Sequence, residues 1–374
     1  MSLCLAVSLA ERLKERIERE GPITFRDWMK AALYDPVGGY YQRSDLARWG
    51  RAGDYRTSPE RSELFAATFA RYFAKLCDEL RRPADWTIVE CGAGDGRFAS
   101  GVLRTLADRF PSVFAATRYL VYESSADAGR QARERLADFG NRVQFCAELP
   151  VVECGLYFSN ELLDAFPVHR VLKKDVELSE FYVSVTPTSN FEWSPGPLST
   201  TRLSEFIEAF SLELVEGQIV EVNLEIDDWL AEVSKKLLNG FVITVDYGAE
   251  VSELYDSTLR PDGTLRAFSR HGFVDDLLAQ PGEYDITASI NWTQVKSVGE
   301  RLGLQVVEFD SQDKFLLRAG LLEEMEYRIA ATDSDAERVR LSTGAREMIL
   351  PGGMASSFQV LVQKRVEEGA RNAA

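Results

Sequence analysis

A glycine-rich stretch has the residue types and spacing that point most directly to chemistry. The β-branched run at residues 87–89 leads into Glu90, and glycines follow at Gly92, Gly94 and Gly96. Glycine lets a backbone turn tightly and leaves room for a ligand to lie against it. The stretch therefore predicts a nucleotide-binding loop between a strand and a helix. An ordinary glycine-rich turn of an α/β protein is the alternative.

Two nucleotide-binding patterns have to be distinguished at this loop. The dinucleotide fingerprint, Gly-x-Gly-x-x-Gly, would need a glycine where the chain has Arg97. The pattern present, Glu-x-Gly-x-Gly-x-Gly, is similar to motif I of class I methyltransferases that use S-adenosylmethionine (SAM). The negative charge of Glu90 suits the ammonium and sulfonium groups of SAM and would repel the pyrophosphate of NAD. The loop therefore favours SAM as the cofactor.

A second acidic residue follows the next predicted strand. Residues 118–123 read as a strand that ends in Glu123, which follows Gly96 by 27 residues. A carboxylate at this place accepts hydrogen bonds from the ribose hydroxyls of a nucleotide. A further strand over 142–146 leads to Glu148, and we expect the adenine contacts there.

The stretch at residues 53–60 holds an acid, a base and two hydroxyls just ahead of a predicted helix. Ser58 is a suitable N-cap and Pro59 would occupy the first helical position. We expect Gly53, Asp54, Thr57 and Ser58 to close over the cofactor, with a capped surface loop as the alternative.

An acidic segment follows the fourth predicted strand, at residues 155–159. Asn160, Glu161 and Asp164 lie in it. In an open α/β sheet the ligand crevice lies at the carboxyl ends of the strands, so this segment is predicted to face the methyl group. Helix capping by Asn160 with a solvated Asp164 is the alternative.

Residues for the substrate side follow the fifth predicted strand. That strand ends in Asp246 and Tyr247, and the polar, turn-rich stretch 249–291 contains Arg266 and His271. So long a stretch without predicted elements suggests a lid or binding element. His271 could accept a proton, although a lone histidine in a loop is more often structural.

These residues need an α/β framework to position them. We predict a class I, Rossmann-like methyltransferase sheet over residues 84–374, with insertions near 175–225 and 249–291. Residues 1–83 are predicted to form a helical N-terminal extension with the cofactor-covering loop. Apolar residues at helical spacing predict helices that are listed here by range: 8–20, 24–35, 58–80, 125–139, 201–212, 226–239, 292–302, 312–330 and 335–347.

Composition limits the partners and the compartment. The 374 residues carry a net charge of −16, which disfavours binding to nucleic acid. The five cysteines include no Cys-x-x-Cys pair and only two histidines are present, so neither a metal site nor a disulfide framework is predicted. The sequence has no segment apolar enough to span a bilayer, so we expect no membrane insertion and a cytoplasmic protein. The oligomeric state is left open.

Several blocks in the same order resemble the MidA family of SAM-dependent methyltransferases, which includes the mitochondrial complex I assembly methyltransferase. The resemblance runs from about residue 20 to about residue 365, and its blocks lie at 21–41, 53–60, 89–97, 159–170, 245–248, 263–271 and 285–291. It implies a protein substrate, with arginine favoured and a respiratory complex subunit as the partner. A non-catalytic assembly factor or chaperone and a small-molecule methyltransferase are the alternatives.

A second resemblance concerns the acceptor. The start of the segment at residues 160–163 is similar to the double-Glu loop of protein arginine methyltransferases, in which two glutamates hold the guanidinium. Glu161 matches the first glutamate, whereas the second would fall near Arg170, which departs from the pattern. Asp164 lies nearer and is the candidate to replace it.

Overall fold

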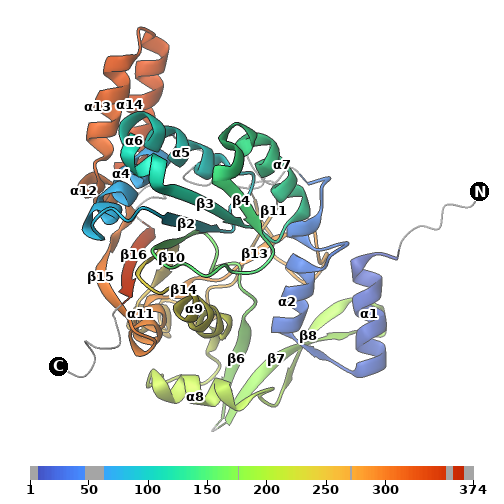
Figure 1. Ribbon diagram of the computed structural model, residues 1–374. Coiled ribbons are helices and arrows are strands. Elements are labelled where there is room, and N and C mark those ends of the chain that lie inside the picture. The colour runs from blue at the N-terminus through green and yellow to red at the C-terminus, as the bar shows by residue number, and fades with distance from the viewer. Residues whose placement is uncertain (1–6, 47–62, 176, 270–271, 351–356, 366–374) are drawn as a thin grey trace, which may run out of the picture. The chain divides into compact units, whose positions relative to one another are not determined.

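The computed structural model describes residues 7–46, 63–175, 177–269, 272–350 and 357–365. The chain divides into two compact units, and each is built from segments that are distant in sequence (Figure 1). We call Arg56–Leu162, Trp229–Gly248 and Val295–Ala374 the sheet unit. The remaining segments, Met1–Tyr55, Leu163–Asp228 and Ala249–Gln294, form the accessory unit.

A mostly parallel sheet forms the centre of the sheet unit. Its strands are β2 (Trp86–Cys91), β3 (Thr117–Tyr122), β4 (Val143–Cys146), β5 (Gly155–Asn160), β10 (Gly240–Ala249), β15 (Leu304–Ser311) and β16 (Phe358–Arg365). They lie in the order β15-β16-β10-β5-β2-β3-β4. The five strands from β4 to β10 are parallel, and β16 is antiparallel to both of its neighbours. Strand order reverses between β2 and β5, which is where a doubly wound sheet opens a ligand crevice. The predicted α/β class is confirmed.

Helices α4 and α5 pack an aromatic cluster onto one face of this sheet. The apolar stripe predicted on α4 is buried, and Phe69 contacts both Phe98 of α5 and Phe158 of β5. The rings of Phe98 and Phe158 are stacked, with centroids 4.4 Å apart. The helices assigned wholly or partly to this unit are α4 (Glu63–Glu79), α5 (Arg97–Arg109), α6 (Pro111–Ala116), α7 (Ala126–Leu136), η2 (Ala137–Arg142), α9 (Glu225–Lys236), α11 (Trp292–Arg301), α12 (Gln312–Ala319), α13 (Leu321–Ala331) and α14 (Asp335–Ile349).

The single helix predicted over 312–330 is instead two helices, α12 and α13. They meet at Gly320, whose φ of 101° lies in the left-handed region that interrupts a right-handed helix. A Cβ added at Gly320 would lie 2.6 Å from the Arg71 side chain, so glycine also allows the close approach of α4.

A second, antiparallel sheet organises the accessory unit. Its strands run in the order β1-β7-β6-β9, with β8 paired to β7. Their bounds are β1 (Ile23–Thr24), β6 (His169–Lys174), β7 (Glu177–Val185), β8 (Phe191–Gly196) and β9 (Ile219–Val222). Helices α1 (Leu9–Glu20), α2 (Phe25–Tyr34) and α8 (Thr201–Ala209) belong to the same unit, as do η1 (Tyr40–Gln42) and α10 (Val251–Leu254). Thr24 caps α2, because its hydroxyl accepts a hydrogen bond from the Asp27 N–H.

Part of the stretch expected to be irregular, 249–291, forms a small three-stranded sheet. Its strands are β11 (Arg266–Ser269), β12 (Gly272–Phe273) and β13 (Asp285–Thr287), in the order β12-β11-β13. A two-residue strand, β14 (Ile290–Asn291), precedes α11. Such short strands lack the alternating pattern that sequence analysis depends on.

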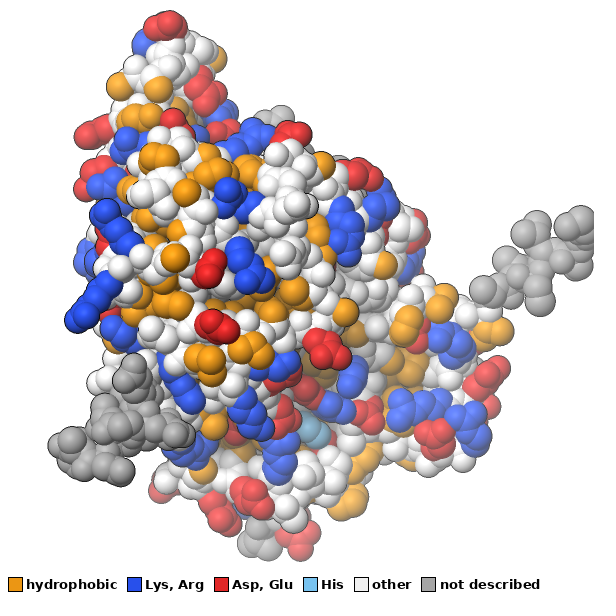
Figure 2. Space-filling view, viewed as in Figure 1, with side chains coloured by type: hydrophobic (Ala, Val, Ile, Leu, Met, Phe, Trp, Pro, Cys, Tyr) orange, Lys and Arg blue, Asp and Glu red, His pale blue; other side chains and the backbone are white. Residues whose placement is uncertain are grey.

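The surface has no strong segregation of charge on the face drawn in Figure 2, where acidic and basic side chains are interspersed. In the described part of the chain, no helix has the length and apolarity needed to cross a membrane. Among the same residues, no group of three potential metal ligands comes together.

Candidate cofactor and acceptor site

The glycine loop leaves the carboxyl end of β2 at the point where strand order reverses. Gly92, Gly94 and Gly96 all have positive φ values, of 72°, 55° and 78°. A Cβ on Gly92 would lie 3.1 Å from the side chain of Leu162, in the segment after β5. A Cβ on Gly96 would lie 3.0 Å from Ala132 of α7. Backbone conformation therefore favours glycine at all three positions, and close packing favours it further at Gly92 and Gly96.

Glu123 connects this loop to the next strand–helix junction. Its carboxylate accepts one hydrogen bond from the Gly94 N–H, at 2.8 Å, and one from the Ser125 N–H, at 2.7 Å. Ser125 is in turn the N-cap of α7. The predicted ribose-binding acid thus lies beside the glycine loop, at the carboxyl end of β3.

Glu90 lies below the loop with its side chain only 4% exposed. The Tyr119 hydroxyl on neighbouring β3 donates a hydrogen bond of 2.7 Å to its Oε2. Burial raises the pKa of Glu90 to about 8, and the nearby carboxylates of Glu123 and Asp95 act in the same direction. With this pKa the side chain is mostly neutral near pH 7, so a positive ligand beside it would favour its ionisation.

Asp95 and Arg135 stabilise the loop and were missed in the sequence. The Arg135 guanidinium, from α7, contacts both the Asp95 carboxylate and its backbone carbonyl, each at 2.9 Å. Arg97 pairs with the same carboxylate at 2.9 Å. The sequence did contain a signal for Asp95, which is an acidic residue inside the glycine motif. No sequence pattern links Asp95 to Arg135, which lies 40 residues later.

The predicted acceptor segment begins at the carboxyl end of β5. Glu161 has a φ of 52°, a left-handed conformation that is uncommon for a residue with a side chain. Its N–H donates to the Val245 carbonyl of β10 at 2.9 Å, and its Oε1 accepts from the Asn160 amide at 3.0 Å. The buried Oδ1 of Asn160 has no hydrogen-bond partner among the described residues. Strained backbone and an unpartnered polar atom therefore occur side by side at the reversal point.

Asp246 and Tyr247 lie at the carboxyl end of the next strand, β10. Asp246 is fully buried, and its carboxylate accepts a hydrogen bond from the Tyr247 N–H at 2.9 Å. The Tyr247 ring packs edge-on against Phe358 of β16. The sheet thus brings the ends of β2, β3, β5 and β10 to one edge, each with an acidic residue predicted for the site.

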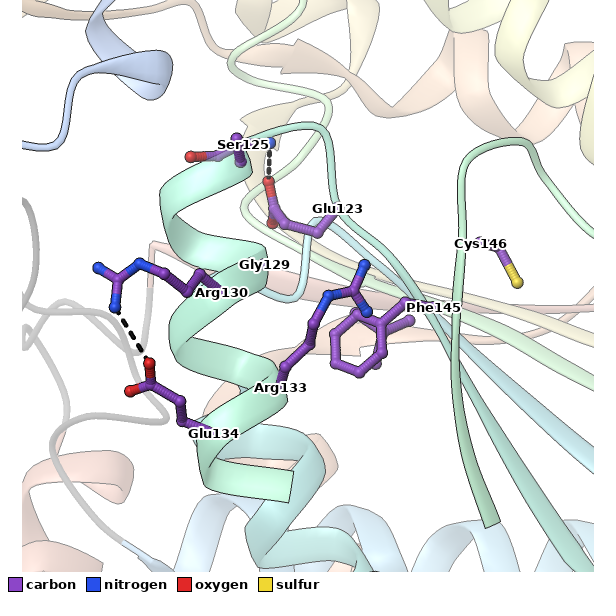
Figure 3. A pocket seen from close by; sticks show the side chains of 10 residues that line it. Glu123, Ser125, Gly129, Arg130, Arg133, Glu134, Phe145 and Cys146 are labelled. Atoms are coloured by element: carbon purple, nitrogen blue, oxygen red, sulfur yellow. Dashed lines mark hydrogen bonds and ion pairs between the residues drawn. The ribbon is translucent and has the colours of Figure 1, made fainter. Parts of the chain in front are cut away.

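A cavity of about 320 Å³ opens where β3 and β4 meet α7 (Figure 3). Glu123 and Ser125 line its upper part, and Phe145 and Cys146 line the wall formed by β4. The Arg133 guanidinium lies over the Phe145 ring, 3.9 Å from its centroid. Gly129 leaves open space, since a Cβ added there would meet no atom within 4 Å.

Glu148 and the remaining candidates belong to other segments of the chain. Glu148 is exposed, two residues beyond the end of β4. Asp164 and Arg266 belong to the accessory unit: Asp164 is buried and its carbonyl accepts from the Ala288 N–H, while Arg266 is exposed at the start of β11. Arg170, at the position where the double-Glu pattern departs, lies 3.4 Å from Glu221 on neighbouring β9.

Five predicted site residues lie outside the described residues. They are Gly53, Asp54, Thr57, Ser58 and His271. The covering role of the first four and the proton-accepting role of the last stay predictions.

The described residues fit SAM in both shape and polarity. The glycine loop leaves space beside it for a ligand. A Cβ at Gly92 would approach Leu162 and make that space smaller. The buried Glu90 and the half-buried Glu123 flank the loop, which suits the positive charges of SAM, and the unpartnered Asn160 Oδ1 can accept a further hydrogen bond. Fold and site together define a class I SAM-dependent methyltransferase.

Comparison with known proteins identifies the family. A family model described as "Putative S-adenosyl-L-methionine-dependent methyltransferase" matches residues 68–310, more than half of the chain. The chain belongs to this family, which confirms the SAM-dependent methyltransferase family indicated by the sequence blocks.

Curated relatives align with nearly the whole chain. The mouse protein arginine methyltransferase NDUFAF7, mitochondrial, is 27% identical, with 97% of this chain and 86% of the relative covered. The human protein of the same name is 25% identical, with coverage of 96% and 85%.

Solved structures show the same fold. A Burkholderia thailandensis protein of the COG1565 superfamily, bound to S-adenosyl-homocysteine, is 29% identical and superposes with a TM-score of 0.85. The alignment covers 96% of this chain and 92% of that one. A second structure from the same organism and superfamily is 28% identical, with a TM-score of 0.81 and coverage of 96% and 91%.

The prediction of a cytoplasmic location is wrong by the same comparison, because the curated relatives are mitochondrial proteins. The prediction depended on cysteine usage and on the lack of an apolar segment. Cysteine usage bears on disulfide formation, and the lack of an apolar segment bears on membrane spanning. Neither observation distinguishes one compartment from another.

Proposed function

We propose that this methyltransferase acts on arginine side chains of a protein substrate. The observation that carries the proposal is Glu161, a carboxylate held by a left-handed backbone at the point where strand order reverses. A carboxylate can accept two parallel hydrogen bonds from a guanidinium, a geometry that fixes its plane. The names of the curated relatives, protein arginine methyltransferases, support the same acceptor.

The cofactor would be held by the elements around the glycine loop. In this proposal Gly92, Gly94 and Gly96 form the surface beneath SAM, Glu123 accepts from its ribose, and Glu90 provides negative charge below it. SAM supplies an electrophilic methyl group on its sulfonium when bound. The contribution of the chain is mainly to position the acceptor, because little new charge develops in such a transfer.

The acceptor would be held by residues at the ends of β5 and β10. Glu161 accepts hydrogen bonds from the guanidinium, and the amide of Asn160 fixes the Glu161 carboxylate from one side. We assign secondary roles on the substrate side to Asp164, Asp246 and Tyr247. Arg266, His271 and the cofactor-side residues Gly53, Asp54, Thr57, Ser58 and Glu148 remain part of the proposal.

We also propose the division into an N-terminal extension over 1–83 and a methyltransferase domain over 84–374. The partner that the family resemblance implies is a subunit of a respiratory complex. The protein is not expected to bind nucleic acid.

The product of the reaction tests this proposal. The purified protein is incubated with SAM carrying a labelled methyl group and a lysate from cells that lack the protein. Labelled protein bands are then hydrolysed to amino acids. We expect the label in methylated arginine of one protein.

Other distributions of the label would contradict the proposal. Label in lysine would place the acceptor in another class. Label confined to small molecules would make the chain a small-molecule methyltransferase, and no label in any fraction would favour a non-catalytic assembly factor.

A further inference from the structure

A second cavity, of about 440 Å³, lies in the sheet unit away from the glycine loop. It is lined by one side of α4, the end of α5, the start of α6 and the end of α12, helices that lie near one another in Figure 1. Its volume lies within the range of about 300 to 1,000 Å³ that is usual for small-molecule sites. We call it the basic cavity, because five cationic residues line it: Arg71, Lys75, Arg82, Arg109 and Arg318.

So many cations in one cavity contrast with the net charge of the chain, −16. Asp78 is the one acidic residue among those that line the cavity. Clustered cations repel one another, so such a group needs anions nearby.

Two of the arginines share one carboxylate. Glu324 is fully buried, and the Arg71 and Arg109 guanidiniums approach it at 3.2 and 3.6 Å. The longer of these contacts exceeds hydrogen-bond distance, and the buried Nε of Arg109 has no hydrogen-bond partner among the described residues. The Tyr327 ring stacks on the Arg109 guanidinium, 3.6 Å away, and keeps it in place.

The other three cations differ in how far carboxylates neutralise them. Arg82 pairs with Asp78, and Arg318 pairs with Glu308 and Asp310. Lys75 is exposed, lies over the Tyr72 ring, and has no carboxylate partner among the described residues. Five cations therefore face four carboxylates. Neutralisation is incomplete at Arg71 and Arg109, which share Glu324, and at Lys75.

The cavity also has an apolar part. Phe110, Val113 and Ala319 line it beside the cations. A ligand that carried charge alone would leave these side chains against water, whereas an organic ligand would cover them.

We infer that the basic cavity binds a small organic anion with at least two negative charges, carried on phosphate or carboxylate groups. Guanidinium groups bind both kinds of oxyanion through paired hydrogen bonds, and Lys75 would supply the remaining positive charge. The concave form and the volume favour a metabolite-sized ligand over an extended peptide.

This site would be separate from the cofactor site. Gly96 precedes the first residue of α5 and Arg109 is its last, so the two sites lie at opposite ends of this helix, about 20 Å apart at the usual rise per residue. Ligand binding at the basic cavity therefore does not depend on the proposed methyl acceptor, and it adds to the proposed function.

Isothermal titration of the full chain tests the inference, with pyrophosphate in one arm and citrate in the other. Sodium chloride keeps the ionic strength constant. We expect one anion per chain in at least one arm, and the stronger arm identifies the oxyanion. Lys75→Glu should weaken binding by about tenfold or more, because it reverses the one cation without an acidic partner. Arg82→Ala, at another exposed cation of the cavity, should weaken binding as well.

The matched control is Lys235→Glu on α9, an exposed lysine of the same unit with the same charge change. It should leave anion binding unaltered, and none of the three variants should change the affinity for S-adenosyl-homocysteine. Melting temperatures confirm that each variant is folded.

Three outcomes would overturn the inference. The first is no binding in either arm below about 1 mM. The second is an equal loss of affinity in Lys75→Glu and Lys235→Glu, which would show that anion binding depends on the net charge of the protein and not on this cavity. The third is binding of a poly-glutamate peptide with neither small anion bound, which would assign the cavity to an acidic protein segment.

Discussion

Glu90 is the residue in which burial and chemistry are most directly linked. It is held in the core of the sheet by a hydrogen bond from Tyr119, and it lies below the loop that we propose for the cofactor. Its raised pKa, about 8, makes its charge depend on both pH and ligand.

The first prediction concerns stability. The unfolded chain releases the Glu90 proton near its ordinary pKa of 4.5, whereas the folded protein holds it up to about pH 8. Between these values the unfolded state binds fewer protons, so the free energy of unfolding falls as the pH rises. Glu90→Gln keeps a hydrogen-bond acceptor for Tyr119 and removes this loss. We expect the variant to gain stability relative to wild type between pH 5 and pH 8, on the order of 3 kcal/mol.

Urea unfolding across this pH range measures the difference. Parallel stability profiles for wild type and Glu90→Gln would show that Glu90 ionises normally in the folded protein.

The second prediction concerns proton release. A positively charged ligand beside Glu90 lowers its pKa, so SAM binding at pH 7 should release close to one proton from wild type. Titration calorimetry in two buffers with different ionisation enthalpies measures this number. Glu90→Gln should release none, and a binding enthalpy that is the same in both buffers for wild type would contradict the proposal.

At the scale of elements, the glycine loop determines whether the cofactor site is open. Gly92 combines a positive φ with close approach to Leu162, so Gly92→Val should strain the loop and fill the space above it. We expect binding of S-adenosyl-homocysteine to fall by about a hundredfold or more, with the fold retained.

Gly217→Val is the control for this variant. Gly217 has a similar φ, of 79°, but a Cβ added there meets no atom within 4 Å. This variant introduces backbone strain in the accessory unit only. Its affinity for S-adenosyl-homocysteine should therefore match that of wild type. Equal affinity of Gly92→Val and wild type for S-adenosyl-homocysteine would show that the loop is not part of the cofactor site.

Local sequence patterns predicted the elements around the loop well, because each has a strong signal of its own. The run before Glu90 and the acid at Glu123 both lie where short-range preferences decide the structure. The failures have a different origin. The left-handed break at Gly320 depends on α4 packing nearby, and β8 contains Pro195 and Gly196, which oppose a strand assignment from sequence.

At the scale of the whole molecule, the sequence predicted the class and missed long-range contacts. The sheet order brings the ends of β2, β3, β5 and β10 to one edge, as a doubly wound fold requires. The pairing of Asp95 with Arg135, and the backbone conformation of Glu161, depend on the assembled sheet. Long-range contacts also assemble each compact unit from three separate segments of the chain.

The central claim is that Glu161 holds the acceptor and has no part in holding the cofactor. The most direct measurement compares Glu161→Gln with wild type in two assays, affinity for SAM and transfer of labelled methyl to arginine in protein. Glutamine keeps the size of the side chain but loses the charge that a guanidinium needs.

Glu153→Gln, an exposed glutamate just before β5, serves as the matched control and should behave as wild type in both assays. For Glu161→Gln we predict unchanged SAM affinity and a loss of arginine methylation of about a hundredfold or more. Retained methylation, or a parallel loss of SAM affinity, would contradict the account.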